Sequence, residues 1–113
     1  MKTAPWTVRA LAERVPALPS DASMSAILAA CLADDEHDWV VLVDGRDRPV
    51  RLVERAAMLL GAPCEHPVDG IAAECTIDAA VRRLGVRPLV LQDAHGCYAG
   101  VVRPERLLRA LAG

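Results

Sequence analysis

Arg103 and Arg106 lie three residues apart, and their guanidinium groups are candidates to bind an anion. A guanidinium pairs bidentately with phosphate or carboxylate oxygens, and the amino-terminal end of a helix favours negative charge. Pro104, between them, suits the first turn of a helix, where its missing N–H is not needed. One hypothesis is therefore that the pair binds phosphate at a helix start. The alternative is that both are surface arginines, with Glu105 beside them to neutralise either charge.

Other segments contain residue types that bind metals. The run Asp34–Asp38 offers carboxylates and one imidazole, but it lacks the glycine of a calcium loop, and we expect a solvated loop. Cys64–His66 and His95–Cys97 bring thiol and imidazole together without a regular zinc spacing, and His95 is expected to be a turn residue. The sequence contains no HExxH motif, nucleophile elbow or phosphate-cradling glycine loop. We therefore expect no catalytic residues, no metal and no enzymatic activity.

Composition narrows the class of protein. Hydrophobic residues make up 53% of the 113 residues, which excludes a disordered chain, and with Trp 2, Tyr 1 and Phe 0 the core must be aliphatic. The net charge of -2 gives no reason to expect nucleic acid or a membrane surface as a partner. The longest apolar run has eight residues, against about 20 in a membrane-spanning helix. No secretory segment is apparent and no CxxC pair occurs, so we expect a cytoplasmic protein with reduced cysteines.

A block of sequence occurs twice, with an offset of 49 residues. Trp39–Asp44 aligns with Pro88–Asp93, and each is a short aliphatic run that ends in aspartate, as in a buried strand followed by a turn. Aspartate and glycine then favour tight turns, because aspartate tolerates left-handed geometry and glycine has no Cβ. Val50–Val53 and Tyr98–Val102 are expected to return as antiparallel partner strands.

A helix is predicted on either side of each hairpin. Ser23 and Thr76 are expected to cap the helices that precede the hairpins, because a hydroxyl can accept a hydrogen bond from the first helical turn. Between these caps the offset is 53 residues, so the first helix or its exit holds about four extra residues. The last helix is expected to place Leu107, Leu108 and Leu111 on one face.

The chain is predicted to contain two small units. Short strands are expected around residues 15–20 and 71–74, and a preliminary helix over residues 7–14. Each unit of about 40–50 residues is too small to be stable alone, so the two should pack with pseudo-two-fold symmetry into one compact module. The predicted divisions are an N-terminal helix with the first repeat (1–60), a linker (61–70) and the second repeat (71–113).

This duplicated pattern resembles a pair of cystathionine-β-synthase-type (CBS) domains, also called a Bateman module. The resemblance rests on Trp39–Asp44 with Pro49–Leu59 and on Pro88–Asp93 with Gly96–Leu108, and it covers nearly the whole chain from about Thr7. It implies an α+β fold of two tandem β-α-β-β-α repeats. It also implies regulation, since such pairs bind AMP, ADP, ATP or S-adenosylmethionine, form homodimers and control an attached enzyme, channel or transporter. They occur both as short separate proteins and in longer bacterial signalling chains.

The nucleotide motif of that family has a glycine at the end of the last strand, a serine or threonine three residues later and an aspartate three further on. The aspartate grips the ribose hydroxyls. In the second repeat Gly100 is present, but Arg103 and Arg106 replace the other two residues. In the first repeat the three positions hold Arg51, Glu54 and Ala57. Neither repeat has the carboxylate that would accept hydrogen bonds from a ribose diol.

We therefore predict a non-catalytic regulatory module that controls an attached or associated effector. It would sense an adenine nucleotide or another phosphate-bearing ligand, and no cofactor is expected to be required. The candidate ligand-binding residues are Gly100, Arg103, Arg106 and Glu54. The alternative is a dimerisation or protein-interaction module that has lost nucleotide binding, which the replaced motif residues favour. A homodimer is expected under either hypothesis.

Overall fold

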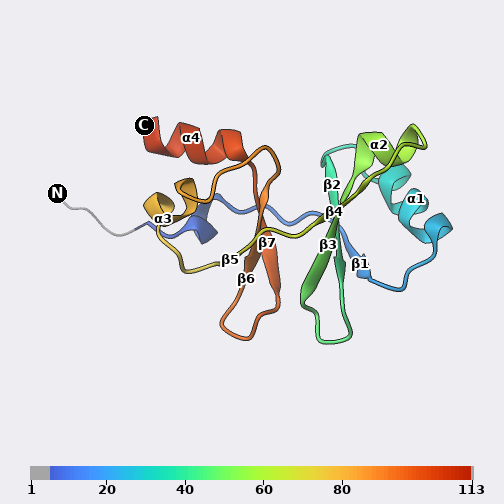
Figure 1. The fold of residues 1–113 in the computed structure, drawn as a ribbon, viewed down its shortest axis with the longest axis horizontal. Coiled ribbons are helices and arrows are strands. Elements are labelled where there is room, and N and C mark those ends of the chain that lie inside the picture. The colour runs from blue at the N-terminus through green and yellow to red at the C-terminus, as the bar shows by residue number, and fades with distance from the viewer. Residues whose placement is uncertain (1–5, 113) are drawn as a thin grey trace. The chain divides into compact units, whose positions relative to one another are not determined.

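The computed structural model describes residues 6–112, which form two compact units (Figure 1). One unit comprises residues 15–68. The other comprises the described residues up to Arg14 together with those from Asp69 onward. We name them the β1–β4 unit and the β5–β7 unit after their strands. No helix within residues 6–112 has the length and apolar character needed to cross a membrane.

The β1–β4 unit consists of a four-stranded sheet and two helices. Its elements in chain order are β1 (Ala17–Pro19), α1 (Met24–Ala33), β2 (Trp39–Val43), β3 (Pro49–Glu54), α2 (Arg55–Leu59) and β4 (Glu65–Pro67). The strand order is β1-β2-β3-β4, with β1 parallel to β2 and the other pairs antiparallel. The buried core comprises aliphatic and sulfur-containing side chains, namely Ile27, Cys31, Val40, Leu42, Val53, Met58 and Cys64.

The β5–β7 unit repeats this plan with shorter elements. They are a 3-10 helix η1 (Val8–Leu11), β5 (Gly70–Ala72), α3 (Ile77–Val81), β6 (Leu89–Gln92), β7 (Tyr98–Val102) and α4 (Pro104–Ala112). The strand order is β5-β6-β7, with a parallel and then an antiparallel pair. The buried core comprises Val8, Ile71, Ala73, Ala80, Leu89, Leu91, Val102 and Leu107.

The hairpins β2–β3 and β6–β7 have the same register when the two repeats are aligned. Val41 lies opposite Leu52, and the residues aligned with them, Val90 and Val101, also lie opposite each other. The register of each hairpin shifts at the equivalent place, just before its last strand pair. The internal repeat predicted from the sequence is confirmed, and so is the α+β fold.

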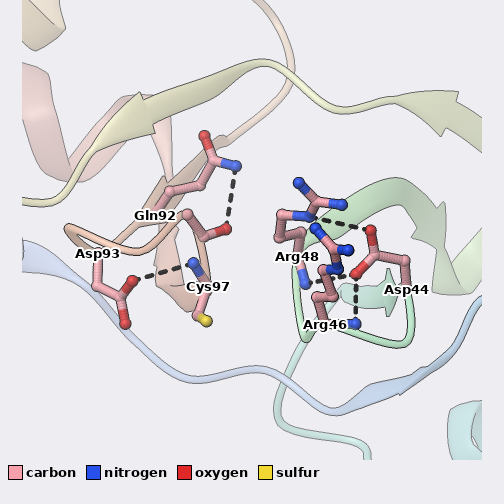
Figure 2. Close-up of polar contacts among 7 residues, drawn as sticks. Asp44, Arg46, Arg48, Gln92, Asp93 and Cys97 are labelled. Carbon is pink, nitrogen blue, oxygen red and sulfur yellow. Dashed lines mark hydrogen bonds and ion pairs between the residues drawn. The ribbon is translucent and has the colours of Figure 1, made fainter.

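Aspartates at equivalent positions close the two hairpin turns (Figure 2). The Oδ1 atom of Asp44 accepts hydrogen bonds from the backbone N–H groups of Arg46 and Arg48, at 2.8 and 3.0 Å. The Oδ1 atom of Asp93 accepts the corresponding pair from the amides two and four residues on, also at 2.8 and 3.0 Å. His95 donates the first of these, so it is a turn residue as predicted.

Each turn contains a left-handed residue three places after its aspartate. These residues are Asp47, with a φ of 65°, and Gly96, with a φ of 83°. Gly45, the glycine of the first turn, does not have a positive φ. The two glycines are therefore two places apart in the aligned repeats, because aspartate, which tolerates this conformation, occupies the left-handed position of the first turn.

The predicted helix caps are confirmed. The Ser23 hydroxyl accepts a hydrogen bond from the N–H of Ala26 at 3.1 Å, and the Thr76 hydroxyl accepts one from the N–H of Ala79 at 3.2 Å. The helices after these caps differ in length, with ten residues in α1 and five in α3. This difference explains why the offset between the repeats is larger at the caps than at the hairpins.

The last helix buries less of its apolar surface than predicted. Of the three leucines expected on one face, Leu107 is fully buried, whereas Leu108 and Leu111 are more than half exposed. Leu108 is one position from Leu107 and points about 100° away from it. Leu111 is on the same side as Leu107 but lies in the last turn of the helix, beyond the residues of the buried core.

Residues 7–13, which we name the arm, pack in the β5–β7 unit (Figure 1). The Val8 side chain is fully buried in that core, and its N–H donates to the carbonyl of Cys75 at 2.8 Å. Glu13 and Val101 exchange two backbone hydrogen bonds of 2.9 Å. A helix was predicted over residues 7–14, but only a 3-10 helix over Val8–Leu11 forms. The residues on either side of it, Thr7 and Glu13, form β-bridges with Thr76 and Val101 instead.

The units accordingly differ from the divisions predicted from the sequence, in which the N-terminal segment accompanied the first repeat. Residues 61–70, predicted to be a linker, contain β4 and the first residue of β5. His66 of β4 lies opposite Leu52, just as Glu13 lies opposite Val101 in the other unit. The arm and the supposed linker are therefore equivalent segments, and each completes the outer edge of one hairpin.

Candidate ligand site

Gly100 lies in β7 where the arm passes the edge of the strand. Its φ is 126°, and a Cβ atom there would lie 3.1 Å from the Cβ of Ala12 and 3.2 Å from the carbonyl oxygen of Glu13. Both the backbone conformation and the close approach require a residue without a side chain. Gly100, a predicted ligand-binding residue, therefore has a packing role: the absence of a side chain lets the arm lie directly against β7.

Arg103, the residue before α4, is paired within its own unit. Its Nε atom lies 3.0 Å from Oε1 of Glu13 in the arm, and a terminal nitrogen lies 3.9 Å from Oε2 of Glu105. Among residues 6–112 the buried Nε has no aligned hydrogen-bond acceptor, so the contact with Glu13 is an ion pair rather than a directed hydrogen bond. The charge that was predicted to attract a phosphate is already balanced by two carboxylates.

Arg106 is in a different environment. It lines a pocket of about 370 Å³ together with Arg109 and Ala110 of α4 and Leu11 of the arm. Within residues 6–112 neither guanidinium has a hydrogen-bond or ion-pair partner. The structure therefore combines Arg106 with Arg109 rather than with Arg103. The sequence reasoning missed Arg109, although its spacing of three residues from Arg106 places both on one side of a helix.

Glu54 occupies, in the β1–β4 unit, the position that Arg103 occupies in the other. Its Oε1 atom lies 3.3 Å from Nε2 of His66 on β4. The His66 ring also meets the half-buried Trp39 indole edge-on, with 6.0 Å between the ring centroids. Both residues at the family's hydroxyl position are thus charged, and each pairs with the segment that completes its hairpin. In one pair the carboxylate lies before the helix, on Glu54, and in the other it lies on the completing segment, on Glu13.

The segments considered for metal binding are explained by local contacts. In the acidic run, Oδ2 of Asp34 lies 2.8 Å from Nδ1 of His37, and this hydrogen bond is the main reason that the pKa of Asp34 is lowered. The Cys64 thiol contacts the Met58 sulfur at 3.6 Å. Burial raises the pKa of the Cys31 thiol. Over residues 6–112, no three His, Cys, Asp or Glu side chains gather as a metal site would require.

Comparisons with known proteins identify solved structures that have the same fold. No family model matches the sequence, and no curated protein matches it. Among solved structures, Staphylococcus aureus OpuCA is similar, with a TM-score of 0.76 and 11% identity over 94% of this chain and 97% of that chain. A CBS-domain pair with bound AMP from Klebsiella pneumoniae has a TM-score of 0.72 and 13% identity, over 95% and 98% of the two chains.

A third similar structure is the CBS domain of a bacterial CNNM/CorC family Mg²⁺ transporter, in complex with an inhibitor. Its TM-score is 0.74 at 19% identity, over 95% of this chain and 76% of that chain. At these identities the likeness establishes the fold, while the ligand has to be inferred from the residues of this chain.

Proposed function

We propose that this chain, whose fold is that of a CBS-domain pair, is a non-catalytic regulatory module that senses a phosphate-bearing ligand and controls an attached or associated effector. The fold supports regulation, because the similar structures include a CBS pair with bound AMP and a CBS domain of a transporter. AMP, ADP and ATP are the first ligands to consider, and S-adenosylmethionine, which has no phosphate, is the comparison compound. A cytoplasmic location is part of this proposal, as the sequence analysis predicts.

The observation that carries the sensing function is the unpaired charge of Arg106. Three of the four candidate residues have other contacts: Gly100 accommodates the arm, Arg103 is ion-paired with Glu13, and Glu54 contacts His66 at hydrogen-bond distance. Arg106 lines an open pocket with its charge unbalanced by any residue from 6 to 112. A guanidinium recognises phosphate rather than a ribose diol, so the ligand is proposed to bind through its phosphate.

Calorimetric titration of the chain with AMP, ADP, ATP, S-adenosylmethionine and cyclic dinucleotides tests this function. A ligand that binds only the folded state also raises the melting temperature, and at 100 times its Kd it adds about 2.7 kcal/mol to the stability. We expect saturable binding of at least one phosphate-bearing compound. A folded protein that binds none of them at millimolar concentration would remove the sensing function.

The second candidate function is a homodimerisation module without nucleotide binding, and helix α1 favours it. The helix carries no charged residue over Met24–Ala33. Ile27 and Cys31 face the core, yet Met24 and Leu32 are more than 60% exposed. A helix that is apolar on all sides is normally covered, and its uncharged surface is suited to pack against the same surface of a second copy.

Sedimentation equilibrium of the wild type and of Leu32→Glu tests the dimer. We expect a wild-type dimer and a monomer for the variant, because a buried unpaired carboxylate is unfavourable at an apolar interface. Val86→Glu is the matched control, since Val86 is 90% exposed and lies outside α1. A monomeric wild type, or equal dissociation of both variants, would contradict an interface at α1.

A further inference from the structure

The pocket in the β5–β7 unit lies between a helix and the arm. Arg106, Arg109 and Ala110 line it from α4, and Leu11 lines it from η1. It is an open depression of about 370 Å³, so a bound group would remain in contact with solvent. The lining thus combines two positive charges with two apolar side chains and contains no carboxylate.

The two guanidiniums differ from the other arginines around the arm. Arg9 pairs with Glu74 at 2.7 Å, and Arg103 pairs with Glu13 at 3.0 Å. Arg106 and Arg109 have no such partner in residues 6–112, and they are one helical turn apart on the same side of α4. Like charges at this spacing disfavour the helix. A bound anion would remove that repulsion, so the pocket is electrostatically suited to negative charge.

The arm holds the opposite wall of the pocket in place. Residues on both sides of Leu11 are attached to the unit, Val8 by its buried side chain and the hydrogen bond to Cys75, and Glu13 by two backbone bonds to Val101. The ion pair between Glu13 and Arg103 adds a side-chain attachment. The wall therefore exists before a ligand arrives, which reduces the entropy lost on binding.

We propose that this pocket is an anion site in which Arg106 and Arg109 together bind the phosphate chain of a small ligand. This inference rests on the proposed sensing function and specifies its site and ligand chemistry. Two guanidiniums one turn apart can each pair with a different phosphate group, which favours a diphosphate or triphosphate over a single phosphate. Because no carboxylate lines the pocket to accept a ribose diol, the phosphate chain is recognised with or without a nucleoside.

Calorimetric titration of the full chain with inorganic pyrophosphate, ADP and adenosine tests the site. We expect pyrophosphate and ADP to bind, adenosine not to bind, and the affinity to fall as salt is raised. Arg106→Gln and Arg109→Gln should each weaken pyrophosphate binding about tenfold, as expected for the loss of one charge-assisted pair. Arg82→Gln is the matched control, because Arg82 is exposed at the end of α3, outside the pocket, and its loss changes the net charge equally.

The other outcomes distinguish failure of the anion site from failure of the sensing function. If ADP binds and pyrophosphate does not, or if all three variants bind pyrophosphate like the wild type, the anion site is wrong while the sensing function stands. If no phosphate compound binds the folded protein, the site and the sensing function fail together. Circular dichroism of each variant shows whether the fold is retained. Arg106→Lys, which keeps the charge but loses bidentate geometry, should bind with intermediate affinity.

Discussion

Asp44 and Asp93, at equivalent positions of the two repeats, accept the same backbone hydrogen bonds in the two hairpin turns, and Asp44 also accepts one from the Arg48 side chain at 3.2 Å. Each side chain accepts two backbone amides, at 2.8 and 3.0 Å, through its Oδ1 atom. Each backbone N–H also donates to the carbonyl four residues on, at 2.9 Å. The backbone hydrogen bonds of the turn are therefore preserved between the repeats, although the four residues after the aspartate differ at every position.

We expect part of the acid sensitivity of the fold to come from these two carboxyls. Backbone hydrogen bonds, mainly from Arg48 to Asp44 and from Cys97 to Asp93, lower the pKa of each carboxyl below its ordinary 3.8. A carboxyl with a lowered folded-state pKa stabilises the fold above its unfolded-state pKa, and this stabilisation is lost as the pH falls through the folded-state value. The loss therefore begins near pH 4 and grows toward lower pH.

Urea unfolding at pH 6 and pH 3 measures this contribution. The double variant Asp44→Asn/Asp93→Asn keeps the side-chain oxygen acceptors but cannot titrate, so it should lose less stability between these pH values than the wild type. Asp35→Asn, an exposed acidic residue outside both turns, is the control. An equal loss in all three proteins would show that the turn carboxyls do not contribute.

The same substitution should have different effects in the two turns. Gly96→Ala forces an L-residue into a φ of 83° and should destabilise the protein by about 1–2 kcal/mol. Gly45→Ala occurs where φ is not positive and no atom lies within 4 Å of the added Cβ. It should be neutral or stabilising by up to about 1 kcal/mol, through a smaller entropy of the unfolded chain. Chemical denaturation of both variants measures the difference, and similar losses would refute the assigned turn geometry.

Gly100→Ala should loosen the arm. The new methyl group would contact Ala12 and Glu13 at close to 3 Å in a left-handed backbone, and the expected loss is about 1–3 kcal/mol. Amide exchange at Glu13 and Val101 should increase, since these residues share the bridge that the methyl group displaces. Gly85→Ala, where the added Cβ meets open space, is the control. Unchanged protection of the two amides would mean that the arm does not depend on this glycine.

The two edge pairs place their carboxylate on different partners, and this predicts a tolerated exchange. Glu54→Arg alone removes the carboxylate that His66 contacts, and His66→Glu alone places a second carboxylate beside Glu54. The double variant reproduces the arrangement of Arg103 with Glu13, so the second change should restore part of the stability lost by the first. A double-mutant cycle at pH 7 should give a coupling below about 1 kcal/mol, because the pair is partly exposed. Additive losses, as expected for Glu54→Arg with Asp35→Asn, would show that the pair is not coupled.

The candidate site was predictable only in part. The prediction that a helix starts beside Arg103 is confirmed, because Pro104 and the helical repeat are local features. Which arginine keeps its charge unpaired was not predictable. That depends on Glu13, which lies 3.0 Å from Arg103 although the two are far apart in the sequence.

The amino-acid sequence by itself determined the hairpins, the helix caps and the duplication. A strand, a turn or a cap is decided by the aliphatic run, the aspartate or the hydroxyl within a few neighbouring residues. Only the tertiary structure decided which segment completes each hairpin. The arm and β4 are too short to show a hydrophobic period. Each lies where it does because it pairs with a strand edge that would otherwise be unpaired, the arm with β7 and β4 with β3.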